Sequence, residues 1–212
     1  MNDLRQYSSD ELLRDGSSIH VRAIRPDDKQ RLREHSEGLS ARSVYFRFLG
    51  PKKGLTDADL AAFTDLDFVN RVALVTTLGK GDEERIIGVG RYAISETAGD
   101  APRSAEIAFS VVDDYQHHGI GTLLLEHLLR IAREQGIRQF EAEVLSDNKA
   151  MLGVIQASGL LARRTVSSGV VHVVFSTEET GARAPTRTEP SEASAARATA
   201  APAAPSRAGR RD

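Results

Sequence analysis

The segment Ala105-Glu106-Ile107-Ala108-Phe109-Ser110-Val111-Val112 is followed directly by Asp113-Asp114-Tyr115-Gln116-His117-His118-Gly119-Ile120-Gly121-Thr122. The first segment alternates apolar and polar residues and is rich in β-forming types, which predicts a strand over residues 106–112. After the second segment, apolar residues recur at helical spacing over residues 120–132, and Gly136 ends the pattern. We therefore expect a strand, a glycine-containing turn and a helix of about four turns.

The turn before this helix has the properties of a phosphate site. The first N–H groups of a helix have no intrahelical partner and lie at the positive end of the helix dipole, so they can hold an anion. Gly119 and Gly121 lack a Cβ, so a phosphate can approach those N–H groups closely. The alternative is a helix start in which the two glycines only turn the chain.

Two common nucleotide motifs fit this turn badly. A P-loop requires a Lys after its last glycine, and a dinucleotide fingerprint requires Gly or Ala where Leu124 stands. The order Gln116-x-x-Gly119-x-Gly121, after a strand that contains Ala-Glu-Ile-Ala-Phe, instead resembles the GNAT superfamily of acyl-CoA-dependent N-acyltransferases. The resemblance implies that this turn cradles the pyrophosphate of coenzyme A.

The resemblance also implies the fold. A GNAT domain is α/β (α+β), with a mixed, mostly antiparallel central sheet that splays between its fourth and fifth strands and is flanked by helices. The resemblance covers residues 15–176, the expected acetyltransferase domain, and residues 1–14 form a polar N-terminal extension with a little helical character. Residues 177–212 contain no Leu, Ile, Val, Phe or Met. We expect a disordered Ala/Pro/Arg-rich tail there, because such a segment buries too little apolar surface to offset its ordering entropy.

The remaining elements follow from periodicity and turn signals. Helices are expected at residues 25–37, 40–49, 56–64 and 148–159, and strands at residues 18–24, 72–78, 85–95, 138–145, 160–166 and 170–176. The strands at 72–78 and 85–95 should form an antiparallel hairpin, with a loop over residues 96–103 after it. Ser146 or Asp147 should cap the helix at 148–159. Tyr45, Phe46 and Phe48 are expected to be mostly core, with the entrance for the acceptor as their alternative place.

Composition narrows the class of protein. The 212 residues suit one α/β domain with a substantial core. With 28 Lys and Arg against 30 Asp and Glu, the net charge of −2 gives no electrostatic reason to expect nucleic acid or an anionic membrane as a partner. The absence of Cys excludes disulfides and thiolate chemistry. No apolar run approaches the length of about 20 residues that spans a membrane, and no signal pattern opens the chain, so we expect a cytoplasmic protein.

Glu106 is the predicted catalytic base. In the GNAT family the pantetheine arm lies along the strand that carries Ala-Glu-Ile-Ala-Phe and brings the thioester near its middle, where the family often places its general base. An attacking amine must be neutral, and because a free Lys has a pKa of about 10.4, a carboxylate acting directly or through water must take its proton. A backbone N–H around Val111 could stabilise the oxyanion. The alternative role for Glu106 is that of a salt-bridged strand residue.

The resemblance further assigns residues to acetyl-CoA. They are Val111, Val112, Gln116, His117, His118, Gly119, Ile120, Gly121, Thr122 and Asn148. Among them, Asn148 would bond the pantetheine or the acceptor, although it suits a helix start equally well. His118 could contact a phosphate. Two adjacent His residues without further ligands are poor evidence for a metal, and we expect none.

Other acidic residues compete with Glu106 less well. Glu141 and Glu143 share one face of the strand at 138–145, where such a pair is usually solvated. Asp113 and Asp114 are expected to fix the turn before the phosphate site. Many GNAT enzymes have a Tyr in or just after the helix at 148–159 to protonate the thiolate. This chain has none over residues 148–176, so the general acid is unassigned.

The N-terminal half narrows the resemblance. The segments Leu13-Arg14-Asp15-Gly16, Val21-Arg22-Ala23-Ile24-Arg25-Pro26-Asp27-Asp28 and Ser43-Val44-Tyr45-Phe46-Arg47-Phe48 look like those of bacterial protein lysine acetyltransferases of the Pat type. This implies acetyl-CoA as the donor and a protein lysine as the acceptor, with an acyl-CoA synthetase as the possible protein substrate. Two alternatives stay open: an enzyme for small amines, and a catalytically silent acyl-CoA-binding module.

Overall fold

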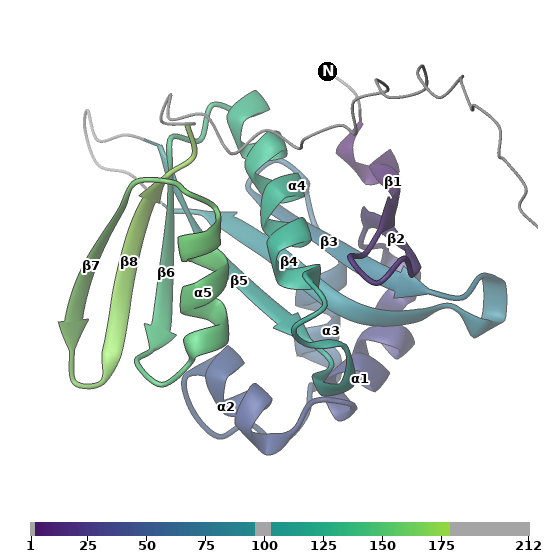
Figure 1. The fold of residues 1–212 in the computed structure, drawn as a ribbon. Helices are drawn as coiled ribbons and strands as arrows, with labels where there is room; N and C mark the ends of the chain where they lie inside the picture. The colour runs from purple at the N-terminus through teal and green to yellow at the C-terminus, as the bar shows by residue number, and fades with distance from the viewer. Residues whose placement is uncertain (1–2, 96–102, 179–212) are drawn as a thin grey trace, which may run out of the picture. The chain divides into compact units, whose positions relative to one another are not determined.

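A mixed sheet organises the chain in the computed structural model, which describes residues 3–95 and 103–178 (Figure 1). In these residues the sheet has eight strands in the order β1-β2-β3-β4-β5-β6-β8-β7. All neighbouring strands are antiparallel except β5 and β6, which are parallel. The expected mixed, mostly antiparallel sheet is confirmed.

Most strands lie where the alternating patterns predict them. Their bounds are β1 Ser8–Leu12, β2 Ser18–Ala23, β3 Arg71–Leu78, β4 Arg85–Ile94, β5 Ser104–Val111, β6 Gln139–Leu145, β7 Ala162–Ser167 and β8 Val170–Ser176. The exception is β1, for which the sequence pattern predicts no strand. Its residues are polar except Leu12, so no alternation marks it; it forms by antiparallel pairing with β2 at the edge of the sheet.

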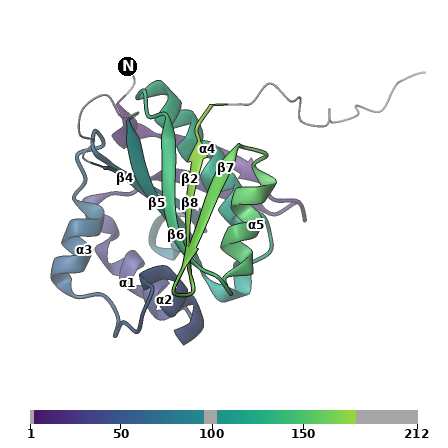
Figure 2. The same cartoon turned by 90° about the vertical axis from the view of Figure 1, so that its left-hand side faces the viewer.

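The helices also occupy their predicted ranges. They are α1 Lys29–Glu37, α2 Ala41–Phe48, α3 Asp57–Thr64, α4 Ile120–Glu134 and α5 Lys149–Ala157. Figure 2 shows α1 and α3 on one side of the sheet and α4 and α5 on the other. No helix in the described part of the chain is long and apolar enough to cross a membrane. Most of the predicted loop at 96–103 and of the predicted tail at 177–212 lies outside the described residues.

Two glycines of β4 let α4 lie close to the sheet. A Cβ on Gly88 would lie 2.7 Å from Cγ2 of Ile120, the first residue of α4. A Cβ on Gly90 would lie 3.0 Å from the ring of Phe109 and 3.1 Å from Leu128. Because a side chain at either position would push the helix outward, bare backbone in β4 fixes where α4 begins.

Two local predictions are wrong. No residue of α2 is fully buried and Tyr45 is 45% exposed, so the expected mostly core placement of Tyr45, Phe46 and Phe48 is wrong, although Phe48 is partly buried and packs against the core. The physical reason is that α2 packs against β5 along one side only, and its residues elsewhere are exposed or half-buried in the described part of the chain. The cap of α5 is Asn148 and not Ser146 or Asp147, because the Asn148 side chain accepts the N–H of Met151 at 3.1 Å.

Candidate active site

β5 and β6 form a fork. They pair only from Ser104 to Glu106, although β5 continues to Val111 and β6 to Leu145 (Figure 1). Past Glu106, the facing edges of the two strands have no strand partner among the described residues. Unpaired N–H and C=O groups on a strand edge can bond an extended ligand as though it were another strand. The predicted splay of the sheet is therefore confirmed.

Glu106 lies at the apex of this fork, as the last residue of β5 that pairs with β6. Its side chain is exposed and shares a face of the strand with Ser110, which bonds His35 of α1. In residues 3–95 and 103–178 no ion pair or hydrogen bond holds the Glu106 carboxylate. The charged group nearest in effect is Arg47, on which Glu106 acts electrostatically without forming an ion pair, so the base and the salt-bridged strand residue both stay predictions for Glu106.

Glu141 is the acidic neighbour of Glu106. It lies opposite Glu106 in the parallel register, so the two side chains share a face on strands about 4.8 Å apart. Glu143 lies further along β6 and is paired with His172 of β8. The sequence shows that Glu141 and Glu143 share a face. The sequence does not show which of them lies opposite Glu106, because no local pattern indicates the register between two parallel strands that are distant in the chain.

A run of free backbone N–H groups opens α4. The N–H groups of residues 117–122 donate to no other residue in the described ranges, while the carbonyl of Gly119 accepts the N–H of Leu123 at 3.0 Å. His117 and Gly119 both have positive φ, of 65° and 90°. Free amides in such a turn at a helix start form an anion-binding arrangement. The predicted phosphate turn therefore has the required backbone geometry.

The two glycines of the turn have different functions. Gly119 precedes α4 in the left-handed conformation, and a Cβ there would meet nothing within 4 Å, so conformation alone favours glycine. Gly121 lies inside the first turn of α4, where a Cβ would lie 3.2 Å from Cγ2 of Val154 in α5. Gly121 therefore allows the beginning of α4 to approach α5 closely.

Gln116 and Asp113 connect the turn to α2. Nε2 of Gln116 donates to the carbonyl of Val111 and to Oγ of Ser43, both at 3.1 Å. Asp113 accepts the N–H of Ser40 at 2.9 Å and the hydroxyls of Ser40 and Ser43 at 2.7 and 3.0 Å. Partial burial raises the pKa of Asp113, but these hydrogen bonds outweigh it and the net pKa lies below its ordinary value. Asp113 thus anchors the start of α2 as well as its own turn.

Burial of Ile120 and the backbone hydrogen bonds of Val112 limit which groups these two predicted coenzyme A residues can present to a ligand. Ile120 is 1% exposed, so only its backbone N–H is available to a ligand. Val112 donates its N–H to Ile87 and accepts the N–H of Tyr115, each at 2.9 Å, so both of its backbone groups are already bonded. Val111 is half-buried at the end of β5, beside the free edge of the fork.

Asn148 and His118 have local partners as well. Asn148 caps α5 through Oδ1, as its alternative role predicts. Nδ1 of His118 lies 2.8 Å from the carbonyl of Gln116, and because a carbonyl can only accept, this nitrogen carries the proton. Nε2 of His118 lies 4.0 Å from a carboxylate oxygen of Asp15. The imidazole therefore lies beside the turn with one nitrogen committed to the backbone.

His35 is a buried group on the Glu106 face that no sequence motif indicates. It is 4% exposed, and Nδ1 donates to the carbonyl of Ile86 at 3.2 Å. Nε2 then accepts the hydroxyl of Ser110 at 2.9 Å. Burial lowers the pKa of His35 to about 4; the bond to Ile86 opposes this, while the charges of Arg91 and Arg47 add to it. His35 is therefore neutral at pH 7.

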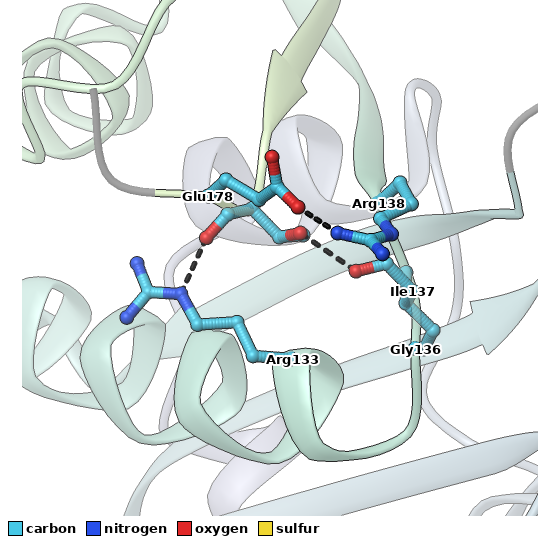
Figure 3. A pocket seen from close by; sticks show the side chains of 6 residues that line it. Arg133, Gly136, Ile137, Arg138 and Glu178 are labelled. Carbon is cyan, nitrogen blue, oxygen red and sulfur yellow. Dashed lines mark hydrogen bonds and ion pairs between the residues drawn. The ribbon is translucent and has the colours of Figure 1, made fainter. Parts of the chain in front are cut away.

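Two open hollows lie away from the fork. One of about 410 Å³ lies at the C-terminal end of α4, and Figure 3 shows how its side chains are tied together. There Arg133 donates to the carbonyl of Thr177, and Arg138 pairs with Glu178. The other, of about 730 Å³, is lined by residues of α1 and of the turn between β3 and β4. Neither includes Glu106 or residues 117–122, so the candidate site is the open fork and its turn.

Known proteins are similar to this chain in sequence and in fold. Residues 42–160 match the acetyltransferase (GNAT) family. The chain is 33% identical over 164 residues to Acetyltransferase PA5475 of Pseudomonas aeruginosa, which covers 76% of this chain and 86% of that protein. The crystal structure of the GNAT domain of S. lividans PAT matches with a TM-score of 0.72 and 39% identity, over 80% of this chain and 96% of that one.

Acetyltransferase Pat of Mycolicibacterium smegmatis is 31% identical over 147 residues, which are 69% of this chain and 42% of Pat. The chain thus spans less than half the length of that relative. The family match includes the fork and the turn at residues 117–122 and extends over more than half of the chain. The resemblance to the GNAT superfamily is thereby confirmed, together with its fold. The chain is a member of the acetyltransferase (GNAT) family.

Proposed function

We propose that the protein transfers the acetyl group of acetyl-CoA to the side-chain amine of a protein lysine, with Glu106 as general base. Acetyltransferases of the GNAT family use acetyl-CoA. The observation that carries the proposal is the placement of Glu106 at the apex of the fork, with the free amides of residues 117–122 at the far end of the same strand. Residues 106–111 of β5 span about 17 Å, a length that an extended pantetheine arm can follow.

The proposed complex with acetyl-CoA uses the turn at residues 117–122, the edge of β5, Gln116 and Asn148. The N–H groups of residues 117–122 hold the pyrophosphate, and the unpaired edge of β5 bonds the pantetheine amides. Gln116 keeps the turn in place from the side, through Val111 and Ser43. Asn148 caps α5 through Oδ1, so its side-chain NH₂ is the group that would bond the pantetheine or the acceptor in this proposal.

The reaction then proceeds by direct attack. Glu106 takes a proton from the ammonium group, directly or through a water, and the neutral nitrogen attacks the thioester carbonyl. The new C–N bond forms, the oxyanion accepts hydrogen bonds from the free edge of β5, and the C–S bond breaks as the tetrahedral intermediate collapses. The thiolate leaves unprotonated or takes its proton from water, since residues 148–176 contain no Tyr.

Similarity to the GNAT domain of S. lividans PAT and to Pat supports a protein lysine as the acceptor. An acyl-CoA synthetase is the proposed protein substrate. A panel of acyl-CoA synthetases and a panel of small amines, each incubated with acetyl-CoA and analysed by mass spectrometry, tests the assignment. Acetylation of small amines alone would contradict the proposed acceptor.

The Glu106→Gln variant tests the proposed base. Its turnover should fall at least about tenfold while its dissociation constant for coenzyme A stays that of the wild type. Glu143→Gln is the matched control, because Glu143 is an exposed acid one strand away that lies beyond the apex of the fork. Wild-type turnover in Glu106→Gln would rule out this carboxylate as the base.

A further inference from the structure

Two arginines on the Glu106 face of the sheet have no anionic partner. Arg91 lies on β4 opposite Ala108, and Arg47 lies on α2, which packs against β5. Neither guanidinium forms a hydrogen bond or an ion pair with any residue in the described ranges 3–95 and 103–178. Both side chains are half-buried.

Among the arginines of the described ranges that are not exposed, Arg47 and Arg91 differ from Arg22, Arg31 and Arg33, which all form ion pairs. Arg22, the most deeply buried arginine of the described chain, bonds Asp28 at 2.7 Å and Glu84 at 2.9 Å. Charges removed from water are normally paired in this way, because an unpaired one loses its hydration without replacement. Arg47 and Arg91 have lost part of their hydration without forming an ion pair with a carboxylate of the described ranges, although the charge of Glu106 acts on Arg47.

Aromatic rings hold both guanidinium groups in place. Arg91 lies over the ring of Phe63 in α3, 4.1 Å from its centroid, and Arg47 lies 5.1 Å from the ring centroid of Phe48. Stacking fixes the plane of a guanidinium but leaves its N–H groups free to bond in that plane. The two groups are therefore oriented donors without acceptors.

The two arginines and Glu106 lie close enough to affect one another's charge. Burial lowers the pKa of Arg91 to about 9, and the charge of Arg47 adds to this shift. Burial also lowers the pKa of Arg47, which the charge of Glu106 opposes. Both arginines remain cationic at pH 7, so an added anion would relieve their mutual repulsion.

The sheet register places Arg91 beside the reacting centre. Ala93 is opposite Glu106 and Arg91 is opposite Ala108. Arg91 and Glu106 are thus diagonal neighbours on one face of the sheet, with Cβ atoms less than about 7–8 Å apart. A substrate group that contacts Arg91 is therefore separated by only a few covalent bonds from an amine or acyl carbon of the same substrate that lies at Glu106.

We propose that Arg47 and Arg91 bind a carboxylate that a substrate carries close to its reacting group, and so select that substrate. The inference rests on the proposed function, because that function places the reaction at Glu106. A planar carboxylate is the anion that a guanidinium fork binds best. It belongs either to the acceptor, beside the amine, or to the acyl group of a dicarboxylic acyl-CoA.

Two sets of matched substrates distinguish these sources. The acceptor arm compares lysine peptides that carry Glu or the isosteric Gln next to the lysine, with acetyl-CoA as donor. The acyl arm compares succinyl-CoA with butyryl-CoA, which has the same chain length without the carboxylate, in both transfer rate and dissociation constant. In one arm we expect the carboxylate form to be favoured about tenfold or more in kcat/KM.

Three variants assign the preference to the arginines. Arg47→Gln and Arg91→Gln should each abolish it while leaving transfer between neutral substrates measurable. Arg42→Gln should keep it, because Arg42 is an exposed arginine of the same helix that also stacks on a ring, that of Phe46. Arg47 and Arg91 come from different elements, so loss of the preference in either folded variant supports the assignment.

Equal use of carboxylate and neutral substrates by the wild type, in both arms, would overturn the inference. A preference that survives in both Arg47→Gln and Arg91→Gln would overturn it as well. These results differ from a failure of the proposed function, in which the wild type would transfer no acetyl group to any peptide or amine of either panel.

Discussion

Lowering the pH should destabilise this protein through one buried side chain, His35. Its folded-state pKa is about 4, against an ordinary value of 6.5, because the site is buried and adjoins Arg91 and Arg47. The unfolded chain therefore binds a proton more readily than the folded one. The stabilisation is complete above pH 6.5 and is lost as the pH falls from 6.5 towards 4.

The size of the effect follows from the shift. A difference of about 2.5 pKa units, at about 1.36 kcal/mol each, gives about 3 kcal/mol, most of which is lost by about pH 4.5. This is a large fraction of the free energy of unfolding of an ordinary domain, which is about 5–15 kcal/mol. His127, whose pKa is also lowered by burial and by Arg130, acts in the same direction.

Urea unfolding of the wild type and of His35→Gln, at pH 7 and pH 4.5, isolates the contribution of His35. The variant should have the smaller loss of stability between the two pH values, by about 2 kcal/mol. His118→Gln is the matched control, because it removes an exposed histidine in place of a buried one. NMR titration of the His35 ring measures the pKa directly. A value at or above 6.5, or equal pH dependence in His35→Gln and the wild type, would refute this account.

Two further predictions concern the start of α4. Gly119→Ala should lose about 1–2 kcal/mol of stability, since φ is 90°, and bind acetyl-CoA more weakly; Gly136→Ala, with φ of 72° beyond the other end of α4, should lose similar stability but keep its affinity. Thermal unfolding and calorimetric titration measure both effects. Gly88→Ala, whose Cβ would lie 2.7 Å from the first residue of α4, should destabilise the protein by about 1–3 kcal/mol and weaken acetyl-CoA binding; unchanged affinity would show that β4 does not set the position of the turn.

The features that the sequence predicts well are encoded locally. Alternation of apolar residues predicts β3, β4 and β5, and the helix expected at residues 56–64 is α3, which begins at a capping box of Thr56 and Asp59. The free amides of residues 117–122 follow from Gly119 at the start of an apolar helix. Each of these signals lies within a few residues of the element it describes, so no knowledge of tertiary structure is needed to read it.

Features that depend on distant segments could not be read in this way. β1 has no alternation of its own and exists because β2 offers a free edge. The pairing of Glu106 with Glu141 depends on a parallel register, and the bond between His35 and Ser110 joins residues that are 75 positions apart. The sequence places Arg47 in a helix with several aromatic residues but does not show whether it has an ion-pair partner, because that depends on the tertiary structure.

The connection between the turn and α2 shows why the two ends of the site are not independent. Asp113 and Gln116 both bond α2, through Ser40 and Ser43. The same helix carries Arg47 towards Glu106. Residues 113–116 lie directly before the amides proposed to hold the pyrophosphate, so a shift of this segment on donor binding would move α2 and with it Arg47. We therefore expect variants that break the bonds of Asp113 or Gln116 to α2 to change the effect of Arg47 on substrate preference as well as the affinity for acetyl-CoA.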